Sequence, residues 1–227
     1  MDLAARLAEV DAGIATAARA AGRDPGAITR IVVTKFHPVA LVDALYALGV
    51  RDVGENRQQE LSEKSAATVG LDGLRWHFIG QAQTNKVKAI RAAASVVHSV
   101  DRIKIADALE AAATPDALTL DVLLQVNLTD DPGRGGVAPG DLEPLAEHVS
   151  GCRTLRLRGV MAVAPLGEPP APSFARLAEY SVRVRAVAPE ATWISAGMTA
   201  DYLEAIAAGA THLRIGSAIT GRRPAHG

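Results

Sequence analysis

The chain has 227 residues, of which 48% are hydrophobic and 22% are charged. Its formal net charge of -1, with both signs evenly mixed, excludes the basic field typical of nucleic-acid-binding proteins. The single cysteine, Cys152, excludes an intramolecular disulfide and favours a reducing compartment such as the cytoplasm. The amphipathic stretch Leu3–Ala21 predicts neither a signal peptide nor a membrane span. We therefore expect one cytoplasmic α/β domain over residues 1–227.

Apolar, β-branched runs alternate with Ala- and Leu-rich helical patterns along the whole chain. The predicted strands are Ile31–Lys35, Asp52–Glu55, Trp76–Ile79, Ser95–Ser99, Leu120–Asn127, Leu157–Val163, Thr192–Ser195 and His212–Ile215. The predicted helices between them are Val39–Leu48, Arg57–Thr68, Thr84–Arg91, Arg102–Ala113, Pro139–Val149, Ser173–Val187 and Ala200–Ala208. Strands separated by helix-length segments predict right-handed crossovers and a parallel sheet.

Eight such units after an extra N-terminal helix predict a closed (β/α)8 TIM-type barrel. An open, doubly wound sheet is the alternative, and it is disfavoured because no Gly-x-Gly-x-x-Gly motif follows the first strand. The segments Asp130–Gly136 and Ala164–Pro172 are rich in glycine or proline and read as loops after strands. In a barrel, such loops lie on the functional face.

Polar side chains at strand ends are the first candidates for a site. Lys35 completes the run Ile-Val-Val-Thr-Lys, where its amine could attack a carbonyl group, although a surface lysine at a strand end is the alternative. Asn56 follows the second predicted strand. His77 lies inside an apolar run and is equally well interpreted as a core histidine. Met161 follows the pattern of most such methionines, which are core residues.

The last two units predict a phosphate site. Ser195-Ala-Gly-Met-Thr199 joins the seventh strand to a helix through a glycine-containing turn, which exposes backbone N–H groups and a hydroxyl. Gly216 and Ser217 follow Arg214 at the end of the eighth strand. Phosphate sites after strands seven and eight recur in barrels. A lysine at strand one and a phosphate cradle here fit pyridoxal 5′-phosphate (PLP) or the substrate of a sugar-phosphate aldolase.

Motifs over nearly the full chain carry a family resemblance. They are Val33-Thr-Lys35, Gly54-Glu-Asn-Arg-Gln-Gln-Glu60, Trp76-His-Phe-Ile-Gly80, Gln83-Thr-Asn-Lys86, His98-Ser-Val-Asp-Arg102, Gln125-Val-Asn127, Arg158-Gly-Val-Met-Ala162, Gly197-Met-Thr-Ala-Asp201 and Arg214-Ile-Gly216. In this order they resemble the PLP homeostasis protein family, whose members are similar to the N-terminal barrel of alanine racemase. The Trp-His-Phe-Ile-Gly segment also disfavours the aldolase.

The resemblance implies a role for each candidate. Lys35 would hold PLP as a Schiff base, and Arg214 would face the pyridine nitrogen. Because an arginine cannot protonate that nitrogen, the ring would be a weak electron sink. The other implied cofactor-binding residues are Asn56 and His77 near the ring, Met161 packed beside it, and Ser195, Gly197, Met198, Gly216 and Ser217 around the phosphate.

Some positions depart from the family pattern. Phe36-His37 replaces a more usual polar pair, Thr199 stands where serine is common, and Thr220 replaces an aromatic residue. Ala196 occupies a position where methionine is common. The loop 130–136 carries Arg134 in place of a lysine.

The resemblance implies a PLP carrier that is not an enzyme and passes PLP to apo-enzymes. We expect a monomer, because the sequence predicts no dimerising domain. A PLP-dependent amino-acid racemase is the alternative, and it needs an acid–base group on each face of the substrate carbon. Lys35 would supply one. In alanine racemases a second domain supplies the other, and we expect none before the last residue, Gly227. The tyrosines occupy helical positions and offer no obvious substitute: Tyr46, Tyr180 and Tyr202.

Overall fold

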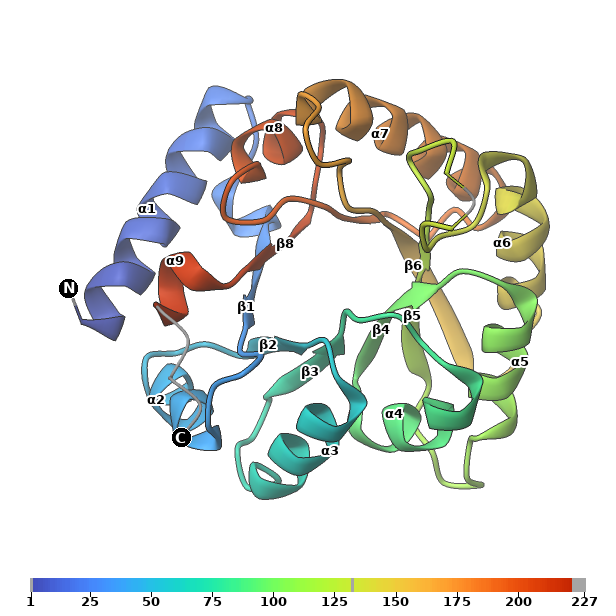
Figure 1. Cartoon of the computed structure of the whole chain (residues 1–227), viewed down its shortest axis with the longest axis horizontal. Coiled ribbons are helices and arrows are strands. Elements are labelled where there is room, and N and C mark those ends of the chain that lie inside the picture. Colours follow the sequence, from blue (N-terminus) through green and yellow to red (C-terminus); the bar gives the residue numbers. More distant parts are fainter. Residues whose placement is uncertain (1, 132, 222–227) are drawn as a thin grey trace.

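The computed structural model describes residues 2–131 and 133–221 and has a closed barrel of parallel strands, each paired with its neighbours in chain order (Figure 1). The predicted TIM-type barrel is therefore confirmed. Pro132 of the predicted loop 130–136, and the last residues 222–227, lie outside the described residues. The strands are β1 Thr29–Val33, β2 Asp52–Glu55, β3 Arg75–Phe78, β4 Val96–Val100, β5 Leu120–Gln125, β6 Leu155–Met161, β7 Trp193–Ser195 and β8 His212–Ile215.

Helices surround the barrel in Figure 1, and the predicted extra helix α1 (Leu3–Ala20) precedes β1. The crossover helices are α2 Val39–Ala47, α3 Gln58–Ala67, α4 Val87–Ala93, α5 Ile103–Ala111, α6 Leu142–Ser150, α7 Pro170–Val187 and α8 Tyr202–Ala207, and α9 Ser217–Thr220 follows β8. Short 3-10 turns occupy Pro25–Ala27, Thr84–Lys86 and Pro139–Asp141. Among the described residues, none of these helices is both long enough and apolar enough to cross a membrane.

Most strand residues are buried, as expected for parallel strands covered on both faces. One large cluster fills the layer between strands and helices, and it includes Val32, Val53 and Leu213. A small second cluster lies apart from it and contains Val96, Leu123 and Met161. Met161 thus packs in the core, as its alternative interpretation stated.

Three local differences from the predicted elements matter for the site. β1 ends at Val33, so Lys35 lies in the following turn rather than in the strand. α7 begins at Pro170, inside the predicted loop, because proline suits the first turn of a helix. The four-residue helix α9 is too short to leave a periodic pattern in the sequence.

Candidate functional site

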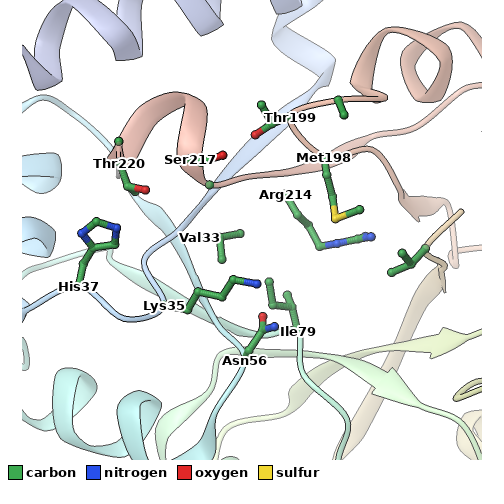
Figure 2. A pocket seen from close by; sticks show the side chains of 14 residues that line it. Val33, Lys35, His37, Asn56, Ile79, Met198, Thr199, Arg214, Ser217 and Thr220 are labelled. Atoms are coloured by element: carbon green, nitrogen blue, oxygen red, sulfur yellow. The ribbon is translucent and has the colours of Figure 1, made fainter. Parts of the chain in front are cut away.

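A pocket of about 390 Å³ opens at the carboxyl ends of the barrel strands (Figure 2). Strand ends and loops from both halves of the chain contribute to it. Its lining is Val33, Lys35, His37, Asn56, Ile79, Val163, Met198, Thr199, Ala200, Arg214, Gly216, Ser217, Thr220 and Gly221.

The turn that carries Lys35 is anchored on both sides by α3. The backbone N–H of Phe36 donates to Oε2 of Glu60 at 2.7 Å, and Nζ of Lys64 donates to the carbonyl oxygen of Thr34 at 2.9 Å. Phe36 has φ 68°, a left-handed conformation that is uncommon for a bulky residue. These contacts hold the turn so that the Lys35 side chain points into the pocket in Figure 2.

A buried ion pair supports this turn from below. Nζ of Lys64 lies 2.6 Å from Oε1 of Glu55, whose side chain is fully buried. The Thr34 hydroxyl donates to the same oxygen at 2.7 Å. Burial raises the pKa of Glu55, and this effect outweighs the opposing hydrogen bonds from Lys64 and Thr34. The pair therefore joins α3, β2 and the end of β1 beneath Lys35.

The turn after β7 brings a hydroxyl to the opposite side of the pocket. Gly197 has φ 90°, and a Cβ there would lie only 2.7 Å from Cβ of Ala205, so the turn requires glycine. The N–H of Met198 donates to Oδ1 of Asp201 at 2.6 Å. This geometry places Thr199 in the lining.

The segment after β8 adds two further hydroxyls, those of Ser217 and Thr220. Gly216 precedes α9 and makes no side-chain cap, so the first N–H groups of that helix receive no side-chain acceptor from it. Figure 2 shows Thr199, Ser217 and Thr220 along one side of the pocket and Lys35 on the other. Hydroxyl and backbone donors of this kind suit an oxyanion.

Arg214 supplies a buried positive charge between these two sides. Its Nη1 donates to Oγ of Ser195 at 2.7 Å, and its Nη2 donates to the carbonyl oxygen of Ala162 at 2.8 Å. Desolvation lowers the pKa of Arg214 to about 10, so the guanidinium still carries its charge at neutral pH.

The pocket brings together six of the predicted cofactor-binding residues: Lys35, Asn56, Met198, Arg214, Gly216 and Ser217. Four others lie outside the lining. His77 is buried in the barrel between Asp52 and His98, and Met161 packs in the second apolar cluster. Ser195 contacts Arg214 rather than the cavity, and Gly197 shapes the turn before Thr199.

Three polar lining residues were missed as candidates. Thr199 and Thr220 carry pocket hydroxyls, and His37 follows the lysine turn. Burial and the nearby charge of Lys64 lower the pKa of His37. For Thr199 the signal was present, because it ends the same glycine-containing turn that indicated the phosphate site.

Comparison with known sequences gives the family. The family model described as "Alanine racemase, N-terminal domain" matches residues 9–224. The pyridoxal phosphate homeostasis protein of Pseudomonas aeruginosa is 42% identical over 224 residues, which cover 97% of this chain and 96% of the relative. The chain belongs to the pyridoxal phosphate homeostasis protein family. Its relative of the same name in Escherichia coli is 36% identical over 233 residues, covering 98% and 97% of the two chains.

Solved structures agree with this assignment. PipY of Synechococcus elongatus with PLP bound is 32% identical, has a TM-score of 0.85, and is matched over 97% of this chain and all of that chain. An alanine racemase from Streptomyces coelicolor is 23% identical with a TM-score of 0.74, and the match covers 99% of this chain but 60% of the racemase. That second likeness shows the shared barrel fold alone.

Proposed function

We propose that this chain binds PLP as a Schiff base on Lys35 and serves intracellular PLP homeostasis. The observation that carries the proposal is the pocket itself, which has an amine on one side, hydroxyl donors on the other, and a guanidinium between them. Its volume of about 390 Å³ lies within the range of small-molecule sites. The PLP-bound relative PipY supports the same ligand.

The donor set fits the chemistry of PLP group by group. Nζ of Lys35 would add to the 4′-aldehyde and form an imine with release of one water. Thr199 and Ser217 would hold the phosphate through their hydroxyls, together with backbone N–H groups near Gly216. Arg214 would face the ring nitrogen as a hydrogen-bond donor.

Arg214 also favours storage over catalysis. Bound PLP supplies an electron sink, which is strongest when a carboxylic acid protonates the ring nitrogen. Arg214 keeps its own proton, so it supports binding without strengthening that sink. The relatives are named as homeostasis proteins, which supports a role in PLP homeostasis. Delivery of PLP to apo-enzymes is part of our proposal. We further propose that the carrier is monomeric and acts in the cytoplasm, with residues 1–227 as one PLP-binding domain.

The decisive experiment is covalent trapping. Protein incubated with PLP should show the absorption band of a protonated Schiff base, and borohydride reduction should fix PLP on the peptide that contains Lys35. Lys35→Ala should lose both signals. Lys104→Ala, which removes an exposed lysine of α5, is the matched control and should keep them. Reduction products on other lysines, with the Lys35 peptide unmodified, would overturn the assignment.

The carrier role is tested by a chiral assay. Wild-type protein loaded with PLP should show no turnover of a panel of L-amino acids to their D-isomers, because racemisation needs acid–base groups on both faces of the substrate. His37, a second titratable side chain in the lining, follows the turn that carries Lys35 and so comes from the same segment as the lysine. Racemisation that disappears in Lys35→Ala would establish an enzyme instead.

A further inference from the structure

A continuous line of polar side chains crosses the barrel interior beneath the pocket. It begins at Asp52, the first residue of β2, and continues through His77 of β3 and His98 of β4. It then reaches Ser195 of β7 and Arg214 of β8. Except for Asp52, each of these residues is buried, so the contacts form where unpaired polar groups are costly.

Every link in this line is a hydrogen bond of ordinary length. Oδ1 of Asp52 lies 2.9 Å from Nε2 of His77, and Nδ1 of His77 lies 2.9 Å from Nε2 of His98. Nδ1 of His98 lies 2.9 Å from Oγ of Ser195, which accepts from Nη1 of Arg214 at 2.7 Å.

The carboxylate end determines the direction of the bonds when both imidazoles are neutral. An arginine only donates and an ionised carboxylate only accepts, whereas a neutral imidazole has one donor and one acceptor nitrogen. The carboxylate of Asp52 accepts from Nε2 of His77, which leaves Nδ1 of His77 to accept from Nε2 of His98. Nδ1 of His98 then accepts from the Ser195 hydroxyl, whose oxygen also accepts from Nη1 of Arg214.

The protonation states required for this direction agree with the surroundings. Burial lowers the pKa of His77 despite its bond to Asp52, and burial lowers the pKa of His98 well below its ordinary value. Both rings are therefore neutral at pH 7. Burial opposes ionisation of Asp52, but the hydrogen bond from His77 and the charge of Arg75 keep its pKa below the ordinary value.

We propose that Asp52, His77, His98 and Ser195 are positioning residues that hold Arg214 toward the ring nitrogen of the pocket ligand. The proposal rests on the proposed function for the identity of that ligand. Ser195 and the carbonyl oxygen of Ala162 occupy Nη1 and Nη2 of Arg214 and so fix the plane of the guanidinium. Because the five N–H groups of an arginine have fixed directions, this leaves the remaining donors aimed in a set direction.

Asp52→Asn tests this line of hydrogen bonds, because Asp52 lies at the end opposite Arg214. An amide can donate to Nε2 of His77, which would move its proton to Nδ1 and reverse the following bonds. Asp121→Asn is the matched control, since Asp121 is also the carboxylate of a strand, β5, and also pairs with Arg75. It makes no hydrogen bond to either histidine among the described contacts.

The first measurement uses ligand-free protein labelled with ¹⁵N in histidine. In the wild type and in Asp121→Asn, His77 and His98 should both give the signals of neutral rings protonated on Nε2. In Asp52→Asn both tautomers should change. Wild-type protein in which either ring carries its proton on Nδ1 would overturn the inferred direction, whatever the protein binds.

The second measurement compares PLP with its 1-deaza analogue, in which carbon replaces the ring nitrogen. Asp52→Asn should weaken PLP binding about tenfold, or ~1.4 kcal/mol, and leave binding of the analogue unchanged. Equal losses for both ligands, or no loss for PLP, would overturn the positioning role. Should Asp52→Asn fail to fold, Ser195→Ala breaks the chain next to Arg214 and should show the same ligand discrimination.

These results separate the two proposals. Wild-type protein that binds neither PLP nor the analogue would overturn the proposed function, and with it the role toward a ring nitrogen. The histidine tautomers, measured without ligand, would still decide whether the hydrogen bonds from Ser195 to Asp52 have the inferred direction.

Discussion

Asn56 and Gly80 illustrate how one residue sets the shape of the pocket. Gly80 follows β3, and its Cα lies so close to Asn56 that an added Cβ would overlap the carbonyl oxygen of Asn56. The atoms of Asn56 that the added Cβ would meet belong to the backbone, so no side-chain rotation can relieve the overlap. Asn56 lines the pocket, so the missing side chain at Gly80 allows one of the lining residues to take its position.

Gly80→Ala should therefore lower the free energy of unfolding by about 1–3 kcal/mol, the usual cost of an overpacked buried site. It should also weaken PLP binding, because Asn56 has to move. Urea unfolding and PLP titration measure the two effects. Gly70→Ala is the control, since an added Cβ there meets nothing within 4 Å. Equal stabilities of the two variants would contradict the close approach.

For single residues of the site, the sequence predicted the residue types well, but it predicted the directions of their side chains less well. Ser195 is still part of β7, so its hydroxyl turns into the barrel and meets His98. The pocket hydroxyl of this turn belongs to Thr199, four residues later. His77 likewise turns inward in β3. The face to which a strand residue points depends on the exact position of the strand, and a sequence pattern locates strand ends only within a few residues.

Among the elements, α3 is the one that holds the lysine turn. Lys64 reaches from α3 to Glu55 at the end of β2 and to the carbonyl oxygen of Thr34. Breaking a buried pair by removing one partner leaves an uncompensated charge, which is far more costly than replacing both. The ion pair is therefore a connection on which the position of Lys35 depends.

Lys64→Met should lower the free energy of unfolding by about 3–5 kcal/mol and weaken PLP binding through displacement of the Lys35 turn. Adding Glu55→Gln should recover part of the stability, because the unpaired carboxylate is then gone. The exposed control Lys88→Met on α4 should change little. Chemical denaturation of the four proteins measures this, and a double variant no more stable than Lys64→Met would count against the pair.

The barrel elements themselves were largely predictable. β2 and β8 have the predicted bounds, because each is a short segment between clear helical patterns. The first strand ends two residues earlier than predicted, since the apolar pattern continues through Thr34 while the backbone already turns toward Phe36. That turn depends on contacts with Glu60 and Lys64, which are distant in sequence and invisible to local propensity.

The molecule as a whole carries buried histidines in its barrel, and they link its stability to pH. His212 of β8 packs against Trp193 with ring centroids 4.2 Å apart, and burial lowers its pKa to about 3. Its ordinary pKa is 6.5, so below that value the unfolded chain binds a proton that the folded barrel excludes. Stability is therefore complete above pH 6.5 and falls as the pH drops toward 3. Burial acts in the same direction on His77 and His98.

When the pH falls from 7.5 to 5.5, each histidine that the fold keeps neutral should lower the free energy of unfolding by about 1.4 kcal/mol. The free energy of unfolding of the wild type should fall by more than this amount, because His77, His98 and His212 are all kept neutral. His212→Phe keeps an aromatic ring against Trp193 and removes one titrating group, so its loss over this interval should be smaller by about 1.4 kcal/mol. His148→Gln, which changes a surface histidine of α6, is the control and should retain the steep dependence. Urea unfolding at the two pH values measures all three proteins. A wild type whose stability does not change over this interval would mean that the barrel accepts protons on these rings, and the neutral hydrogen-bond chain beneath Arg214 would then be wrong as well.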